Sequence, residues 1–208
     1  MPRRFKGTVE IESRRRLHDG FFKLDELTLR HSRFDGGMTP WLTREVLHQR
    51  RAVAVLPFDP HKDQVVLLEQ FRPSVDPKTA NPWLLEAVAG LGEGDEQLVD
   101  IARRETLEET GLEIGRLEWA LNYRATPGCS TEFVSVYIGE VSAPDDGSLH
   151  GLADEGEDIR TLIFDRAEAL RLLEQGEIVS TTAVIPLLYL ASHHERLRSH
   201  WSSDSLTS

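Results

Sequence analysis

Short stretches of alternating or continuous apolar residues dominate the N-terminal part of the chain, and this pattern is typical of β-strands. The run AVAVLPF at 52–58 predicts a buried strand, and QVVLLEQFR at 64–72 predicts its hairpin partner, because Asp59 and Pro60 between them favour a turn. Residues 43–50 fit either a strand or a short linker. The other strands predicted in this part of the chain span 6–12, 21–31 and 83–89.

The apolar period becomes helical after the glycine-rich segment GLGEGDEQ, from about residue 96 to residue 110. Asp95 is the expected N-cap, and Gly111 is expected to end the helix in a left-handed backbone conformation. Strands and helices then follow on both sides of a long polar segment at 142–158. The predicted strands span 116–124, 132–141 and 159–164, and the predicted helices span 165–175 and 181–200.

Strands joined mainly as hairpins and flanked by helices indicate a mixed α/β sandwich rather than a regular series of βαβ units. The strands in residues 1–50 are too few to bury a core of their own. We therefore expect a small N-terminal antiparallel β-sheet domain at 1–50, a larger domain at 51–200 and a frayed tail at 201–208.

The charge balance excludes some partners. The chain has 208 residues, of which 24 are basic and 35 acidic, and its formal net charge is −11. Nucleic-acid-binding proteins normally present a basic surface, so no nucleic-acid partner is expected.

No apolar run is long enough to cross a membrane, and no apolar signal-peptide core follows the basic first residues. The single cysteine, Cys129, fits a reducing compartment, and a cytoplasmic location is expected.

Glutamates are crowded on the helix predicted near residue 100. Glu105, Glu108 and Glu109 stand three or four residues apart, where like charges cost roughly a few tenths of a kcal/mol per pair. At about 100° per residue, Glu105 and Glu109 share one stripe with the apolar residues that face the core. Arg104 offsets part of this charge, but one arginine does not balance three glutamates and Glu96. A divalent metal would balance it.

The donor types indicate which metal is expected. A set of carboxylates without clustered cysteine or histidine favours Mg²⁺ or Mn²⁺ over Zn²⁺. The glycines that follow Ala89 permit a close approach of the backbone, so the carbonyl of Ala89 is a further candidate ligand. The residues themselves therefore predict a metal-assisted phosphate chemistry.

Residues 90–112 match the pattern GX5EX7REUXEEXGU, in which U is a bulky aliphatic residue, and are identified as a Nudix box. Thr106 departs from the pattern at an aliphatic position, which affects packing rather than chemistry. Pro127 lies fifteen residues beyond the box, as in the ADP-ribose pyrophosphatase branch of the Nudix superfamily, and segments over most of 20–165 also resemble that branch. The matching identities are Gly90, Glu96, Arg104, Glu105, Glu108, Glu109, Gly111 and Leu112.

The resemblance implies a Nudix-type α/β/α sandwich with a mixed sheet, and it implies roles for individual residues. Glu108 would lie beside the metal site, Arg104 would orient the carboxylates, and Glu155 on the acidic loop would be the general base. The implied metal ligands are the Ala89 carbonyl, Glu105, Glu109, Glu96 and Glu157. The implied substrate contacts are Arg72 to the diphosphate, Glu132 to the terminal ribose, and Phe21 and Arg44 of a partner subunit beside the adenine.

The resemblance thus implies a homodimer that hydrolyses ADP-ribose to AMP and ribose 5-phosphate with Mg²⁺, or with Mn²⁺. A second reading keeps this chemistry but changes the substrate to another nucleoside diphosphate sugar, such as a GDP-sugar, because specificity lies outside the box. A third reading is a non-catalytic sensor that binds ADP-ribose. Against the sensor, every motif carboxylate is present, and residues 1–50 show no helix-turn-helix pattern.

Overall fold

The computed structural model describes residues 4–92, 94–152 and 156–202. Within these ranges the chain forms two compact units. The first unit contains the chain up to Arg50 together with Arg124–Phe133, and the second contains Arg51–Tyr123 and the chain from Val134 onward. Residues 124–133 therefore pack with a part of the chain that is distant from them in sequence.

The first unit is built on an antiparallel sheet with the strand order β1-β2-β3. Its strands are β1 (Val9–Asp19), β2 (Lys23–His31) and β3 (Leu42–His48). The segment that fitted either a strand or a linker is therefore a strand. Residues 124–133 join this sheet beside β3, since the N–H of Leu47 donates to the carbonyl of Cys129 at 2.8 Å and the N–H of Thr131 donates to the carbonyl of Leu47 at 2.9 Å.

The bounds predicted for the first strand are wrong. A strand at 6–12 was expected, but β1 begins at Val9 and continues to Asp19. Cross-strand ion pairs explain the longer strand: Arg15 lies opposite Glu26 on β2, and their side chains meet at 3.0 Å. Opposite charges that face each other across an antiparallel ladder stabilise it, and this partner is invisible in the local sequence.

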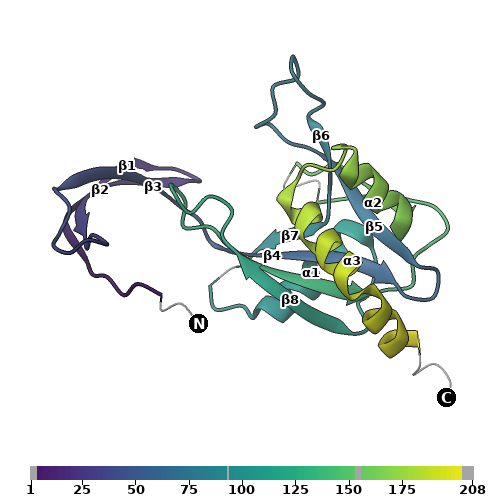
Figure 1. Ribbon diagram of the computed structural model, residues 1–208. Helices are drawn as coiled ribbons and strands as arrows, with labels where there is room; N and C mark the ends of the chain where they lie inside the picture. Colours follow the sequence, from purple (N-terminus) through teal and green to yellow (C-terminus); the bar gives the residue numbers. More distant parts are fainter. Residues whose placement is uncertain (1–3, 93, 153–155, 203–208) are drawn as a thin grey trace. The chain divides into compact units, whose positions relative to one another are not determined.

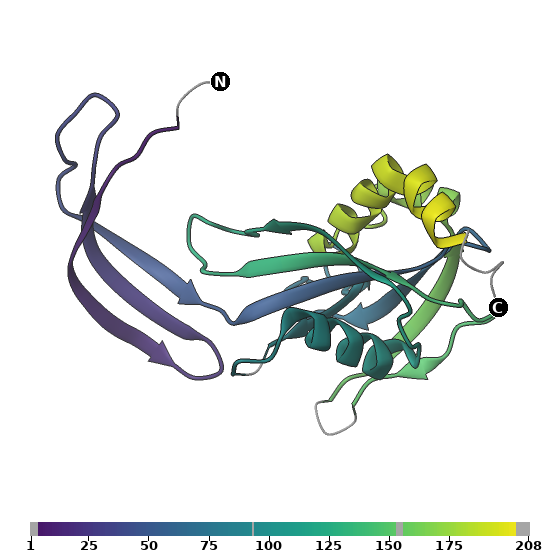
Figure 2. The same cartoon turned by 90° about the horizontal axis from the view of Figure 1, so that it is seen from below.

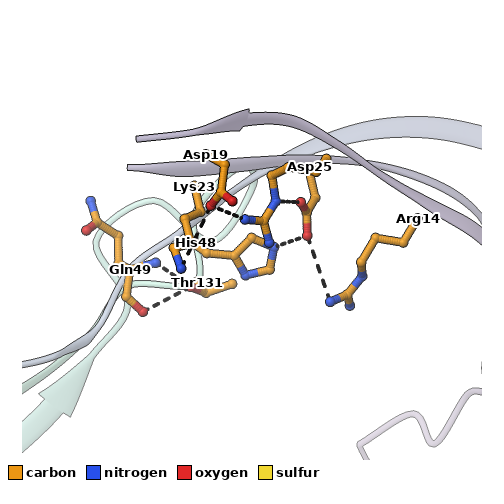
Figure 3. Close-up of polar contacts among 8 residues, drawn as sticks. Arg14, Asp19, Lys23, Asp25, His48, Gln49 and Thr131 are labelled. Atoms are coloured by element: carbon orange, nitrogen blue, oxygen red, sulfur yellow. Dashed lines mark hydrogen bonds and ion pairs between the residues drawn. The ribbon is translucent and has the colours of Figure 1, made fainter. Parts of the chain in front are cut away.

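A buried carboxylate lies on β2, the middle strand of this sheet. Asp25 on β2 is only 1% exposed, and Figure 3 shows basic side chains converging on it. Arg16 donates a hydrogen bond to Oδ1, while Oδ2 lies 2.9 Å from Nε2 of His48 and 3.9 Å from Nη1 of Arg14. The hydrogen bond from Arg16 lowers the pKa of Asp25 below its usual value, against the opposing effect of burial. The carboxylate is therefore held ionised by partners within its own unit.

The second unit is a sandwich around one sheet with the strand order β10-β11-β5-β4-β9-β8, where β6 also pairs with β5 and β7 with β4. The strands are β4 (Arg51–Asp59), β5 (Gln64–Phe71), β6 (Trp83–Glu86), β7 (Val88–Leu91), β8 (Leu117–Tyr123), β9 (Phe133–Glu140), β10 (Leu149–His150) and β11 (Ile159–Asp165). The helices are α1 (Leu98–Thr110), α2 (Arg166–Glu174) and α3 (Thr181–Ser202).

Helices cover both faces of this sheet, with α1 on one face and α2 and α3 on the other (Figures 1 and 2). The strand β4 is buried from Ala52 to Asp59 because its side chains alternate between the two covered faces. Val53 belongs to the core under α1, whereas Phe58 belongs to the core under α3. The predicted α/β sandwich and the separate small antiparallel sheet are confirmed. In the described part of the chain, no helix is both long enough and apolar enough to span a bilayer.

Two predicted boundaries in the second unit are wrong. The single strand expected at 83–89 is two strands, because β6 pairs with β5 while β7 pairs with β4. The N-cap of α1 is Gln97 rather than Asp95, and its carbonyl accepts the first helical hydrogen bonds. The expected helix stop is confirmed, since Gly111 has φ 69° and caps α1 in the left-handed conformation.

The predicted tail also begins too early. The helix α3 continues to Ser202, and Trp201 is 2% exposed. Its ring lies 6.3 Å from that of Phe58 in the core under α3. Burial of a large aromatic side chain stabilises the last helical turn, which the polar residues around it did not suggest.

Candidate active site

The helix α1 places Glu109 against the backbone of β7. The Glu109 side chain is buried, and its Oε2 accepts a hydrogen bond from the N–H of Ala89 at 3.1 Å. Ala89 is itself fixed by pairing with Ala54 of β4. The structure therefore brings together two of the predicted metal-site residues, which are twenty positions apart in the chain.

Glu105 lies one helical turn earlier on α1 and covers Gly90. A Cβ atom added to Gly90 would lie only 2.0 Å from the carboxyl carbon of Glu105. Any side chain at this position would therefore displace the carboxylate or separate α1 from β7. The first glycine of the box is required here for close approach rather than for an unusual backbone conformation.

Arg104 ties the remaining box carboxylates together. Its Nε donates to Oε1 of Glu96 at 3.1 Å, and its Nη1 donates to Oε2 of Glu108 at 2.9 Å. The same Nη1 lies 3.0 Å from Oε1 of Glu105. One guanidinium thus contacts three carboxylates, and the role of Arg104 in orienting metal ligands remains a prediction.

Negative charge is nevertheless in excess at the site. Burial raises the pKa of Glu109 to about 8, with further contributions from Glu105 and Glu157, while the N–H of Ala89 and the charge of Arg72 oppose the rise. Burial likewise raises the pKa of Glu105 to about 7, although Arg104 opposes it. Both carboxylates therefore hold protons more tightly than usual when no cation is present.

These donors fit a divalent cation. All of them are oxygens, and a cation between Glu105 and Glu109 would replace the protons that burial favours. Within the described ranges, no three acidic, histidine or cysteine side chains already converge into a metal cluster. Glu96 and Glu108 point to Arg104 instead, because like charges separate when only an arginine is available to balance them.

The acidic loop after β10 brings Glu157 near the helix carboxylates. Its charge raises the pKa of both Glu105 and Glu109. The base of the loop is narrow: the N–H of Leu152 donates to Oε2 of Glu157 at 3.3 Å, and the N–H of Glu157 donates to the carbonyl of Leu152 at 3.1 Å. The predicted general base, Glu155, lies outside the described residues.

Glu86 is a further charged residue near the site, and sequence reasoning missed it. Nε and Nη2 of Arg72 both donate to Oε2 of Glu86, at 2.8 Å and 2.5 Å. The hydroxyl of Ser180 donates to the other oxygen, Oε1 of Glu86, at 2.8 Å. A charged residue within the apolar segment WLLEAVA was the available signal, because such a residue is costly to bury without partners.

The other predicted substrate contacts belong to the first unit. The Phe21 side chain is 80% exposed and packs edge-on against Phe22. Arg44 is exposed on β3, and its Nη1 donates to the carbonyl of Thr43 at 2.7 Å. Glu132 is held by a hydrogen bond from its N–H to the Ser130 hydroxyl at 3.1 Å. The substrate roles of Phe21, Arg44 and Glu132 remain predictions.

Comparison with known proteins decides the family. Residues 48–182 match the NUDIX domain, and the box and its carboxylates lie inside the matched segment. This chain belongs to the NUDIX family. The membership that the Nudix box predicted is therefore confirmed.

Several curated proteins are similar to this Nudix chain over nearly its whole length. An ADP-ribose pyrophosphatase from Escherichia coli strain K12 is 43% identical over 197 residues, which cover 95% of this chain and 94% of that protein. An ADP-ribose pyrophosphatase from Haemophilus influenzae is 36% identical, with coverages of 93% and 90%. A GDP-mannose pyrophosphatase from Escherichia coli strain HS is 33% identical, with coverages of 86% and 92%.

A solved structure shows the same fold at low sequence identity. The structure described as an ADP compounds hydrolase matches this Nudix chain with a TM-score of 0.70 and 18% identity. The match covers 91% of this chain and 96% of the other. Since the identity is so low, this likeness concerns the fold alone.

Proposed function

We propose that this protein hydrolyses the diphosphate bond of ADP-ribose, producing AMP and ribose 5-phosphate, and that it uses Mg²⁺, with Mn²⁺ as the alternative ion. The observation that carries the proposal is the excess negative charge at Glu105 and Glu109, which α1 holds against the Ala89–Gly90 backbone. The 43% identity to ADP-ribose pyrophosphatases over 95% of the chain supports this substrate.

The proposed chemistry divides the work among the residues of the site. A divalent cation bound by Glu105 and Glu109 would neutralise the diphosphate and lower the pKa of a coordinated water. Arg104 keeps the carboxylates in position, and Arg72 binds an oxygen of the diphosphate. Glu155 takes the proton from the water that attacks phosphorus. Glu96, Glu157 and the Ala89 carbonyl complete the proposed ligand set.

The first unit has two proposed roles. Phe21 and Arg44 flank the adenine, and Glu132 binds the terminal ribose. The unit also forms a homodimer, which its exposed apolar side chains support, because such groups on a small sheet are candidates for burial in an interface. These side chains are Phe5, Val9, Ile11, Phe21, Phe22, Phe34 and Trp41. The free thiol of Cys129 suits the proposed cytoplasmic location.

A second candidate substrate is a GDP-sugar. It is favoured by the 33% identity to a GDP-mannose pyrophosphatase, and it would use the same metal site. Both the identity and the share of this chain that is covered are lower than for the ADP-ribose pyrophosphatases. ADP-ribose is therefore the first substrate to test.

The deciding experiment is product analysis after purified protein and Mg²⁺ are incubated in parallel with ADP-ribose, GDP-mannose and NADH. We expect AMP and ribose 5-phosphate from ADP-ribose, and loss of both with Glu109→Gln, which excludes a contaminating enzyme. Preferential cleavage of GDP-mannose would establish the second candidate. Binding of ADP-ribose without cleavage of any substrate would favour the sensor.

A further inference from the structure

We propose that Glu86 is a positioning residue for Arg72, and that Ser180 at the start of α3 holds Glu86 in place. This inference rests on the proposed contact between Arg72 and the substrate diphosphate. Glu86 itself faces neither the box carboxylates nor the acidic loop in any contact of the described residues. Its role is therefore to act through the guanidinium of Arg72.

The geometry of the pair restricts Arg72 strongly. Two of its nitrogens, Nε and Nη2, converge on one oxygen of Glu86 at 2.8 Å and 2.5 Å. Hydrogen bonds from two nitrogens to one oxygen hold the Nε–Nη2 edge of the planar guanidinium toward Glu86. Among the described residues, Nη1 of Arg72 has no partner, and the side chain is 37% exposed. Arg72 thus keeps donors for a ligand while its orientation is set.

Glu86 is a rigid anchor for this purpose. Its side chain is 7% exposed, and β6 is paired with β5, the strand that Arg72 follows. The second oxygen of Glu86 accepts from the hydroxyl of Ser180 at 2.8 Å. The carbonyl of Ser180 accepts hydrogen bonds from Ala183 and Val184, so this residue belongs to the first turn of α3. A side chain held at both oxygens loses little further entropy when Arg72 binds a ligand.

The location of Arg72 makes the restraint useful. Its charge is near enough to Glu109 to lower the pKa of that carboxylate. Without Glu86, the arginine could turn toward the excess negative charge of Glu105, Glu109 and Glu157 and form an ion pair there. Glu86 therefore keeps Arg72 available to an anionic substrate, in addition to orienting it.

The first test is Glu86→Gln, which keeps the shape of the side chain and its contact with Ser180 but removes the charge that holds Arg72. We expect KM for ADP-ribose with Mg²⁺ to rise about tenfold, as for the loss of one charge-assisted contact, while kcat stays within about twofold. The dissociation constant of ADP-ribose, measured by calorimetry in EDTA so that no turnover occurs, should rise by a similar factor. An unchanged KM together with an unchanged dissociation constant would overturn the inference.

The matched control is Glu118→Gln. Glu118 is also held by one arginine and one hydroxyl, since Arg196 donates to both of its oxygens and Tyr189 donates to Oε1 at 2.9 Å. We expect this variant to change KM by less than about twofold, because Arg196 is not a proposed substrate contact. An equal rise in KM in both variants would show a general loss of structure and overturn the specific role of Glu86.

A double substitution separates an action through Arg72 from an independent one. Arg72→Ala should raise KM, and adding Glu86→Gln to it should have almost no further effect. Effects that multiply would show that Glu86 acts independently, which overturns the inference while the proposed function stands. Absence of both binding and hydrolysis of ADP-ribose by the unmodified protein would overturn the proposed function and the inference with it.

Ser180→Ala provides a test that does not remove the buried charge, in case Glu86→Gln fails to fold. It removes the hydrogen bond to Oε1 of Glu86 and the 2.9 Å contact between the hydroxyls of Ser180 and Thr182, and we expect a smaller rise in KM of about two- to threefold. Melting curves of every variant establish that folded protein is compared. A folded Ser180→Ala variant with an unchanged KM would overturn the role given to Ser180.

Discussion

Each of the two units contains a buried carboxylate, and their surroundings differ in kind. Asp25 of the first unit is 1% exposed and is met by Arg16, His48 and Arg14, so its pKa is lowered. Glu109 of the second unit is 4% exposed, and burial raises its pKa to about 8, although the N–H of Ala89 donates a hydrogen bond to it.

This difference is the one we expect between a structural carboxylate and the proposed metal ligand. A buried carboxylate that has basic side chains of its own unit around it needs no other partner. Those side chains stabilise its ionised form. A buried carboxylate without such cations either binds a proton or recruits a cation from solution. The second arrangement is useful to an enzyme that must bind a metal reversibly, and perturbed pKa values are characteristic of such sites.

The largest expected effect comes from Glu109→Gln. We expect kcat for ADP-ribose with Mg²⁺ to fall on the order of 10³-fold, because several kcal/mol of charge stabilisation in the transition state would be lost. The melting temperature in EDTA should not fall, since the variant removes a buried carboxylate that lacks a cation. Steady-state kinetics measure kcat, and calorimetric melting measures the melting temperature. A large loss of stability together with normal turnover would show that Glu109 is a structural residue like Asp25.

A smaller loss is expected from Arg104→Lys. Lysine keeps the charge but cannot reach Glu96, Glu105 and Glu108 with one planar group. We expect kcat to fall about tenfold or more, as for other residues that orient metal ligands, with little change in melting temperature. A titration with Mg²⁺ should show weaker activation. Full activity at the same Mg²⁺ concentration would mean that the carboxylates orient themselves.

The pH dependence of stability should have opposite signs for the two carboxylates. The pKa of Glu109 is higher in the folded protein than its usual 4.5, so the folded state binds more protons and stability in EDTA falls as pH rises from about 5 to 8. The pKa of Asp25 is lower than its usual 3.8, so its contribution is present at neutral pH and is lost as pH falls below about 4.

Calorimetric melting across this pH range measures both effects. Mg²⁺ should reduce the loss of stability between about pH 5 and pH 8, because the cation takes the place of the proton on Glu109. Glu109→Gln should also flatten the curve in this range without affecting the loss at low pH. An identical slope in the variant and the unmodified protein would contradict the assignment to Glu109.

The smallest effect on turnover is expected from Asp25→Asn. This change leaves Arg16, Arg14 and His48 around a neutral group, and we expect a lower midpoint of unfolding in the first unit. Urea unfolding followed by hydrogen exchange at amides of β1 and β2 would locate the loss. The metal dependence of kcat should match that of the unmodified protein. A changed requirement for Mg²⁺ would remove the distinction between the two carboxylates.

Local features of the sequence predicted the parts of the fold that local forces control. The helix with the box carboxylates ends at Gly111 as predicted, because left-handed backbone at a helix terminus strongly favours glycine. The buried strand at 52–58 lies within β4, since a continuous apolar run is stable only where both faces are covered. Errors occurred where pairing or packing with another element sets the boundary, as in the extension of β1, the division between β6 and β7, and the burial of Trp201.

For the site, the sequence by itself determined the family and the chemical groups, because the box places glycine, arginine and glutamates at spacings that one helix brings together. Only the tertiary structure decided which charges are neutralised. Glu86 meets Arg72 across a strand pair and Ser180 across 94 positions, and Asp25 meets His48 from a neighbouring strand. Electrostatic energy depends on distance in space and on burial, and neither can be read from the spacing of residues along the chain.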